Sequence, residues 1–363
     1  MKFVHIGDLH LGKMLHQYSL LDIQKDLLSQ LLDYMDRENL KVLVIAGDIY
    51  DRSVPPLEAV NVLDEFLDRA INELNIKVLM ISGNHDSSDR LNFASSLLRK
   101  EGLYIETQVH KEMKPVVIDD VKFYLLPFFK PSLMKRFSEQ TLVTYQDALA
   151  YYLSQQIFEG RNNILVTHQF VGKNSIRSES ESTLSVGGTE IIDASVFDAF
   201  DYVALGHLHA PQKVERETIR YSGSLMKYSF NEVNQRKSIT IVDTDDYSIS
   251  FHELEPKIDV RIIRGEYVAL IKESSDDLLM IELLDDKIIP YAVDHLRVRY
   301  PHLLQIIYPN ITKKNHIIHD RQELERKTLL ELYQQFYHHV NDKELDQEYI
   351  DLIIEMKEES GQS

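Results

Sequence analysis

The sequence contains no cysteine among its 363 residues. It therefore forms no disulfide and offers no thiolate, so a metal site would have to use His, Asp, Glu or Asn side chains. Tryptophan is also absent, and Gly and Pro number only 13 and 10, which excludes a collagen-like or low-complexity chain. The lack of cysteine is typical of a reducing compartment, and we expect the protein to be cytoplasmic.

Long apolar runs are missing as well. Asp8 interrupts the one N-terminal stretch that could serve as a signal-peptide core, and charges interrupt every other apolar run. No segment reaches the roughly 20 apolar residues of a membrane-spanning helix. We therefore expect a soluble protein that makes no use of a membrane.

Acidic residues are in excess, with 58 Asp+Glu against 40 Lys+Arg and a formal net charge of −18. Such a surface repels nucleic acid over long range, so charge alone favours a function that does not involve DNA. A nucleic-acid substrate would require local basic patches, bridging cations or a basic partner.

The first half of the chain alternates between strand-like and helix-like segments, which predicts a mostly parallel sheet. The expected strands are 2–7, 41–46 and 76–81, and the expected helices are 20–39, 57–73 and 90–99. Hairpin-like stretches follow at 116–126, 212–222 and 238–254, with further strands at 163–167 and 202–206 and a helix at 145–158. We expect the later strands to form a second sheet that packs on the first.

Changes in pattern divide the chain into three parts. Residues 1–256 are the predicted main domain, and 257–312 have short β-rich segments that indicate a small accessory domain. Residues 320–359 carry broad apolar stripes at helical spacing, which predicts a pair of amphipathic helices that must be covered. A Ser/Glu/Gly-rich stretch at 174–188 is predicted to be a long loop.

Five short polar motifs each come directly after a predicted strand. They are Gly-Asp8-Leu-His10, Gly-Asp48, Gly-Asn84-His85-Asp86, Thr-His168 and Gly-His207-Leu-His209. The carboxyl edge of such a sheet is where ligands bind, and the preceding glycines suit a backbone that passes close to a ligand. Each motif alone has an ordinary structural explanation, but charged groups gathered at one edge are costly to bury without partners. Together they predict a metal site.

The expected donors are carboxylate, amide and imidazole groups, which suit Mn²⁺, Fe²⁺ or Zn²⁺. Seven donors exceed what one ion needs, so the pattern favours two ions about 3.5–4 Å apart that share a carboxylate. Such a centre binds phosphoryl oxygens and activates water. The predicted reaction is phosphoester hydrolysis.

In order and spacing, these motifs resemble those of the calcineurin-like metallophosphoesterases, and within them a family of bacterial DNA nuclease subunits. The resemblance covers nearly the whole chain and implies an α/β fold: a two-sheet metallophosphoesterase core flanked by helices, a small accessory (capping) α+β domain and a C-terminal helical pair. It also implies that one ion is held by Asp8, His10, Asp48 and His209, and the other by Asp48, Asn84, His168 and His207. Mn²⁺ is the expected metal, and His85 is implied as the catalytic histidine.

The same resemblance implies a DNA exonuclease and hairpin-opening endonuclease that acts with a coiled-coil ATPase in DNA end processing, repair and recombination. The ATPase would supply much of the DNA-binding surface and would be contacted by the helices at 320–359. A homodimer within a heterotetramer is also implied. Its expected contacts, from helices 57–73 and 90–99, are Leu63, Phe66, Leu67, Phe93, Leu97 and Leu98.

Several alternatives remain open from the sequence. A phosphodiesterase or phosphatase for small molecules is the second enzymatic hypothesis, and a non-catalytic scaffold is the third. The role of Asp51 is undecided. Five basic residues are either DNA contacts near the site or part of a solvated face; they are Lys130, Lys135, Arg136, Lys173 and Arg177.

Overall fold

The computed structural model describes residues 1–172, 175–178, 181, 190–311 and scattered residues between 330 and 350. The chain divides into two compact units, Met1–Leu283 with Ile289–Ile307, and Leu284–Ile288 with Tyr308–Ser363. The predicted loop at 174–188 and the predicted helices at 320–359 lie mostly outside the described residues. Within the described residues, no helix is both long enough and apolar enough to cross a membrane.

The first sheet has six strands in the order β14-β13-β1-β4-β5-β6. Its parallel strands are β1 (Lys2–Ile6), β4 (Val42–Ile45), β5 (Lys77–Ile81) and β6 (Leu103–Glu106). β13 (Ile239–Asp243) runs antiparallel to β1, and β14 (Ile249–His252) pairs antiparallel with β13. The prediction that the hairpin at 238–254 belongs to the second sheet is therefore wrong, because its first strand pairs with β1.

The second sheet also has six strands, in the order β11-β12-β10-β9-β8-β7. Its strands are β7 (Val116–Ile118), β8 (Val121–Leu126), β9 (Asn163–His168), β10 (Tyr202–Gly206), β11 (Gln212–Val214) and β12 (Arg216–Tyr221). The four central strands are parallel, and the two edge strands, β7 and β11, are antiparallel to their neighbours. The core thus has the two sheets that the sequence predicts, and both contain parallel and antiparallel pairs.

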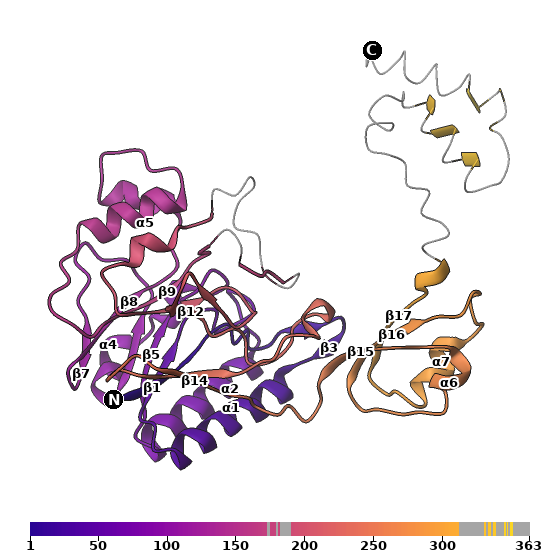
Figure 1. Cartoon of the computed structure of the whole chain (residues 1–363), viewed down its shortest axis with the longest axis horizontal. Coiled ribbons are helices and arrows are strands. Elements are labelled where there is room, and N and C mark those ends of the chain that lie inside the picture. The colour runs from indigo at the N-terminus through magenta and orange to yellow at the C-terminus, as the bar shows by residue number, and fades with distance from the viewer. Residues whose placement is uncertain are drawn as a thin grey trace. The chain divides into compact units, whose positions relative to one another are not determined.

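The alternation of side chains along the strands explains how the two sheets pack. Phe3, Val44 and Leu79 of the first sheet share one buried cluster with Phe123 and Val166 of the second. The residues between them point the other way, as the period of two requires. Those of the first sheet pack against α1 (Leu21–Arg37) and α2 (Leu57–Asp68), and those of the second pack against α5 (Tyr145–Ser154) (Figure 1).

The prediction of a single helix at 90–99 is wrong. The chain forms two short helices there, α3 (Ser88–Leu91) and α4 (Ser95–Leu98), because Ala94 between them has a left-handed φ of 58°. Of the expected dimer contacts, Leu63 and Phe66 are buried in the core of their own unit, whereas Phe93 is 82% exposed and Leu97 is 68% exposed. The chain's own packing therefore uses part of the surface that was expected to meet a second copy.

Short elements connect the main ones. They are β2 (Met14–Leu15), β3 (Tyr18–Ser19), the π-helix η1 (Arg69–Glu73), and the 3₁₀-helices η2 (Arg99–Glu101), η3 (Pro131–Arg136), η5 (Ala194–Phe197) and η6 (Phe230–Glu232). Of these, η6 lies in the connection from β12 to β13. That connection brings residues from outside the polar motifs against the strand ends.

A smaller three-stranded parallel sheet follows the main core. Its elements are β15 (Val260–Gly265), α6 (Tyr267–Leu270), β16 (Leu278–Leu283), α7 (Ala292–Arg297) and β17 (Leu303–Ile307). The hydroxyl of Tyr300 donates a hydrogen bond to the carbonyl of Leu270 at 2.7 Å. Val260 and Leu278 join the buried cluster of the first sheet, which attaches the start of this sheet to the core.

Candidate metal centre

The five polar motifs meet where the carboxyl ends of two sheets come together. β1, β4 and β5 of the first sheet lead into the motifs of Asp8, Asp48 and Asn84, and β9 and β10 of the second sheet lead to His168 and His207. Two backbone bonds join neighbouring motifs of the first sheet: the amide of Asp8 donates to the carbonyl of Gly47 at 3.0 Å, and that of His10 to the carbonyl of Asp48 at 2.9 Å.

Hydrogen bonds also join the two sheets at this edge. The backbone amide of His207 donates to both carboxylate oxygens of Asp8, at 3.0 and 3.1 Å. The ring Nδ1 of His168 donates to the carbonyl of Ala46 at 2.9 Å. Residues far apart in the sequence are therefore held in direct contact, and the spacing between the sheets sets the geometry of the cluster.

The backbone at the cluster is strained. Asp8, His10 and Asp48 have left-handed φ values of 54°, 43° and 49°. Such conformations cost about 1–3 kcal/mol each in non-glycine residues and are concentrated at functional sites. The two neighbouring glycines have no room for a side chain, since a Cβ on Gly83 would lie 2.1 Å from Oδ1 of Asp48 and one on Gly206 would lie 1.8 Å from the carbonyl oxygen of Ala46.

One group of side chains centres on His168. Its Nε2 lies 2.9 Å from Oδ1 of Asn84 and 3.4 Å from Oδ2 of Asp48. Nδ1 of His207 lies 3.2 Å from the same oxygen of Asn84. His168 is fully buried, and Asp48 and His207 are nearly so.

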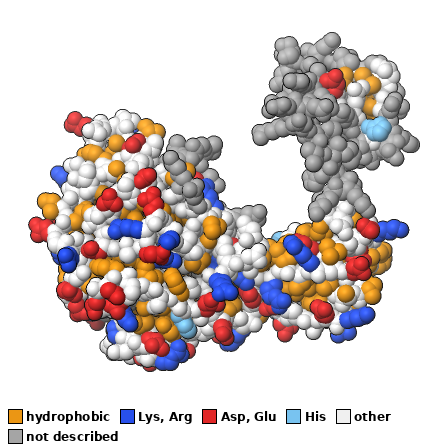
Figure 2. Space-filling model, viewed as in Figure 1, with side chains coloured by type: hydrophobic (Ala, Val, Ile, Leu, Met, Phe, Trp, Pro, Cys, Tyr) orange, Lys and Arg blue, Asp and Glu red, His pale blue; other side chains and the backbone are white. Residues whose placement is uncertain are grey.

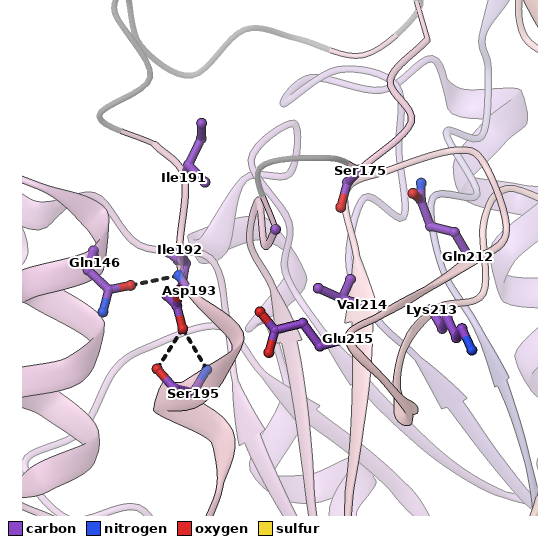
Figure 3. Close-up of a pocket in the computed structure, with 11 residues that line it drawn as sticks. Gln146, Ser175, Ile191, Ile192, Asp193, Ser195, Gln212, Lys213, Val214 and Glu215 are labelled. Carbon is purple, nitrogen blue, oxygen red and sulfur yellow. Dashed lines mark hydrogen bonds between the residues drawn. The ribbon is translucent and has the colours of Figure 1, made fainter.

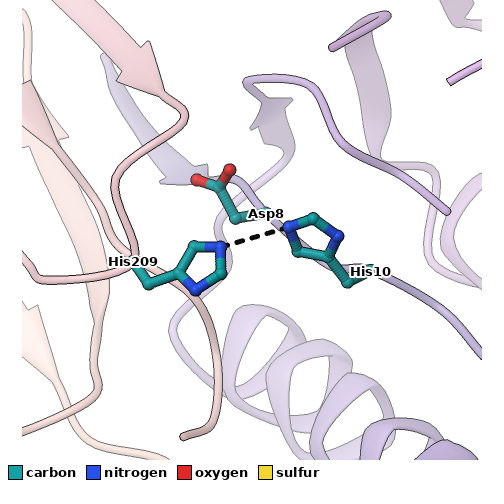
Figure 4. Close-up of side chains that lie close together, drawn as sticks. All are labelled: Asp8, His10 and His209. Atoms are coloured by element: carbon teal, nitrogen blue, oxygen red, sulfur yellow. Dashed lines mark hydrogen bonds between the residues drawn. The ribbon is translucent and has the colours of Figure 1, made fainter. Parts of the chain in front are cut away.

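A second group lies beside the first and includes Asp8, His10 and His209 (Figure 4). Nε2 of His10 faces Nε2 of His209 at 3.2 Å and also lies 3.6 Å from Oδ2 of Asp48. One potential ligand atom from each of Asp8, His10 and His209 lies within 4.8 Å of the others, and the same is true of Asp8, Asp48 and His168. Asp48 therefore borders both groups.

Burial sets most of the proton affinities in the cluster. It raises the pKa of Asp8 well above its ordinary value and lowers the pKa of His10, His207 and His209. Burial would also raise the pKa of Asp48 and lower that of His168, but the attraction between the Asp48 carboxylate and the His168 imidazole outweighs burial in both cases. The pKa of Asp48 is held well below its ordinary value, and that of His168 is raised to about 9.

The side chains of the cluster are of the types that bind divalent cations. The neutral imidazoles of His10 and His209 bring two ring nitrogens face to face next to a carboxylate, and His168 faces two oxygen acceptors. Nitrogen and oxygen lone pairs that converge in a buried place are the donor set of Mn²⁺, Fe²⁺ or Zn²⁺ sites. The donor chemistry thus agrees with the metal site predicted from the motifs.

His85 lies at the rim of this cluster. Its backbone amide donates to Oδ1 of Asp48 at 2.9 Å, and its Nδ1 donates to the carbonyl of Asp51 at 2.9 Å. The ring packs edge-to-face on His10 with centroids 4.8 Å apart. The carboxylate of Asp51 pairs with Nζ of Lys13 at 2.8 Å and lies 3.6 Å from Nδ1 of His10. With His10 and His85 it also forms a group whose potential ligand atoms lie within 4.8 Å of one another.

Sequence reasoning missed the supporting role of Asp86. Its carboxylate accepts hydrogen bonds from the backbone amides of Ile49, Tyr50 and Gly83, at 3.1, 3.0 and 2.8 Å. It ties the loop after β4 to the loop after β5, and burial raises its pKa to about 6. A carboxylate three residues after a strand-ending glycine could have indicated this role, because side chains of this kind often bond to nearby backbone amides.

A separate cavity of about 860 Å³ lies beside α5 and β11 (Figure 3). Its wall includes Gln146, whose side-chain oxygen accepts a hydrogen bond from the amide of Asp193 at 2.8 Å, and Ser195, which bonds to the carboxylate of Asp193. The cavity's lining residues within the described chain do not include a member of the polar cluster.

Comparison with known families agrees with this fold and donor set. The family model of the calcineurin-like phosphoesterases matches residues 1–211. A second model, described as the type 5 capsule protein repressor C-terminal domain, matches residues 256–341. The two-sheet fold and the buried His/Asp groups thus define a metallophosphoesterase, a hydrolase.

Two curated relatives match over almost their whole length. The SbcD subunit of the SbcCD nuclease from Staphylococcus epidermidis is 35% identical over 371 residues, which cover 97% of each chain. The protein of the same name from Staphylococcus saprophyticus is 35% identical over 356 residues, which cover 95% of this chain and 94% of that one. The chain belongs to the SbcD nuclease family of the calcineurin-like phosphoesterases.

A solved structure also aligns with the chain. The crystal structure of TT1561 of Thermus thermophilus covers 70% of this chain and 99% of its own length, with a TM-score of 0.41 and 9% identity. At this distance the alignment adds nothing to the family assignment.

Proposed function

We propose that the chain is the nuclease subunit of an SbcCD-type complex. It would be a dinuclear-metal DNA phosphodiesterase with exonuclease and hairpin-opening endonuclease activity, acting in DNA end processing, repair and recombination. The observation that carries the proposal is the convergence of buried donors from two sheets on one edge, in a chain whose relatives are named as nuclease subunits. The same edge contains His85, a histidine suited to proton transfer.

The proposed ligands form two overlapping sets. Asp8, His10, Asp48 and His209 would hold one divalent ion, and Asp48, Asn84, His168 and His207 the other, with Mn²⁺ as the proposed metal. The position of Asp48 beside both groups supports its role as the shared ligand. When bound, such ions polarise phosphoryl oxygens and favour the ionisation of water near neutral pH.

The chain's own side chains would orient the phosphodiester and move the proton. Because Nδ1 of His85 donates to the carbonyl of Asp51, a proton that this ring gives to the substrate would come from Nε2. Protonated at Nε2, His85 would stabilise negative charge on the phosphoryl group and give its proton to the leaving oxygen. His10, packed on the His85 ring, would limit that ring's rotation.

The proposed partner is an SbcC-type coiled-coil ATPase, which the helices predicted at 320–359 would contact. Acidic and basic side chains are interspersed over the visible face of the molecule (Figure 2), and the chain carries a net charge of −18. This charge supports the proposal that the partner supplies much of the DNA-binding surface, with bound cations offsetting the acidic site. Absence of cysteine supports the cytoplasm as the proposed location.

The remaining proposals concern assembly and domain limits. Exposed Phe93 and Leu97 support a homodimer, which with two ATPase subunits would form a heterotetramer. We retain the domains 1–256, 257–312 and 320–359, with the first boundary supported by the start of the second family model at residue 256 and by β15 at residue 260.

One assay tests the function. The purified chain, with and without its ATPase partner, is incubated with Mn²⁺ and linear duplex, hairpin DNA or a nitrophenyl phosphate ester. We expect Mn²⁺-dependent cleavage of both DNA substrates, increased by the partner and ATP. Turnover of the small ester with no DNA cleavage under any of these conditions would instead favour a small-molecule phosphodiesterase.

A further inference from the structure

A buried carboxylate lies directly behind the proposed ligand His209. Glu232, in η6, has no exposed surface, although no sequence motif marks it. Its Oε1 lies 3.3 Å from Nδ1 of His209 and accepts hydrogen bonds from the hydroxyls of Ser178 and Ser229, at 2.5 and 3.1 Å. Because an ionised carboxylate only accepts hydrogen bonds, Nδ1 of His209 carries the proton and its Nε2 carries the lone pair.

The second oxygen of Glu232 is equally well satisfied. Oε2 accepts from the backbone amide of Tyr228 at 3.2 Å and from Nζ of Lys237 at 2.6 Å. Lys237, which is 8% exposed, also donates to the carbonyl oxygen of His209 at 2.8 Å and to the hydroxyl of Ser224 at 2.8 Å. The Glu232–Lys237 pair therefore contacts both the ring and the backbone of His209.

We propose that Glu232 is a positioning residue for metal binding: supported by Lys237, it orients the His209 ring and fixes the tautomer that presents Nε2 to a divalent cation. The inference rests on the proposed function, because it assigns a supporting role to one of the proposed metal ligands. A carboxylate bonded to the second nitrogen of a metal-binding histidine raises the basicity of the first and holds the ring in place.

A purely structural ion pair would not require this arrangement. Lys237, the Ser178 hydroxyl and the Tyr228 amide alone already give Glu232 three donors, so both oxygens of the carboxylate are satisfied without His209. The imidazole is nevertheless turned so that Nδ1 meets Glu232 and Nε2 meets His10, 3.2 Å away. This orientation thus places Nε2 of His209 on the side of the ring that faces the cluster.

Glu232→Gln tests the proposal because it keeps the shape of the side chain and removes its charge. Mn²⁺ binding to the metal-free chain is measured by isothermal titration calorimetry, with Mn²⁺ electron paramagnetic resonance to separate the two sites. We expect one of the two sites to bind about 10–100-fold more weakly, and the other to change little. Nuclease activity should recover at high Mn²⁺, because the variant loses affinity rather than a group that touches substrate.

A matched control is Asp277→Asn, which lies just before β16 of the three-stranded sheet. The Asp277 carboxylate accepts hydrogen bonds from Arg261, from the Ser275 hydroxyl and from the amide of Asp259. This variant should leave both Mn²⁺ affinities unchanged. A Glu232→Gln variant that circular dichroism shows to be folded, and that binds two Mn²⁺ ions with wild-type affinity, would overturn the proposal.

A second measurement does not depend on the variant's folding or on bound metal. In wild-type chain labelled with ¹⁵N-histidine, nuclear magnetic resonance identifies which His209 nitrogen carries the proton, with His209→Asn used to assign the signals. Protonation at Nδ1 supports the bond to Glu232, and protonation at Nε2 alone would overturn it. Wild-type chain that binds no Mn²⁺ would instead contradict the proposed metal centre, so the two failures are distinguishable.

Discussion

Metal binding should release a proton from His168. In the metal-free chain its pKa is raised to about 9, chiefly by the carboxylate of Asp48, although burial opposes this rise. At pH 7.5 the imidazole is therefore mostly protonated, and a cation that binds its Nε2 must displace the proton. The difference of about 1.5 pH units costs roughly 2 kcal/mol at pH 7.5, at about 1.4 kcal/mol per unit.

Two consequences can be measured. Calorimetric titrations with Mn²⁺ at pH 7.5 in HEPES and in Tris, which differ in ionisation enthalpy, should show release of at least about one proton per chain. The apparent affinity should rise about tenfold per pH unit from pH 7 to 8.5 and level off above about 9, where His168 is already neutral. His168→Gln should release about one proton fewer, whereas His110→Asn, which removes an exposed histidine outside the cluster, should not alter the count. Release of less than about a third of a proton by the wild-type chain would refute this reasoning.

Three further predictions follow from the same site and surface. Asp48→Ala should abolish Mn²⁺-dependent DNA cleavage while the circular dichroism spectrum is retained, because this carboxylate borders both donor groups; retained cleavage would remove its bridging role. His85→Ala should bind Mn²⁺ normally but lose about 10²–10⁴-fold in turnover at saturating metal, since it removes a proton donor and not a ligand; near-normal turnover would contradict its catalytic role. Phe93→Ser should shift the proposed dimer toward monomer in light scattering, as this side chain is 82% exposed, and a wild-type chain that is monomeric at micromolar concentration would exclude that dimer.

The positions of the polar motifs could be predicted from sequence because each one follows a short buried strand. β10, at Tyr202–Gly206, has the predicted bounds, and β1 and β9 differ from theirs by one residue. Parallel neighbouring strands end at the same edge of a sheet. The predicted strand ends were therefore enough to predict that the motifs lie close together. Short buried apolar runs carry this information locally, without any knowledge of long-range pairing.

Long-range pairing and single backbone angles could not be predicted in the same way. The alternation at 238–254 indicates a hairpin but says nothing about which sheet its first strand joins, and that choice depends on the pairing of Lys2 with Asp243. The apolar spacing at 90–99 is compatible with one helix, yet a single left-handed residue, Ala94, divides it. Such choices are set by tertiary contacts that override local preference.

The supporting groups of the site were missed for a related physical reason. Asp86 and Glu232 act by accepting hydrogen bonds from backbone or side-chain groups that lie far away in sequence, so their neighbours in the sequence give little sign of their role. The strain of the left-handed residues at the cluster has to be offset by such contacts. Asp86 fixes the loops of the first sheet, and Glu232 holds a histidine that follows the second. Because the hydrogen bonds of His207 to Asp8 and of His168 to Ala46 cross between the sheets, the donor geometry depends on how the two sheets pack as well as on the motifs themselves.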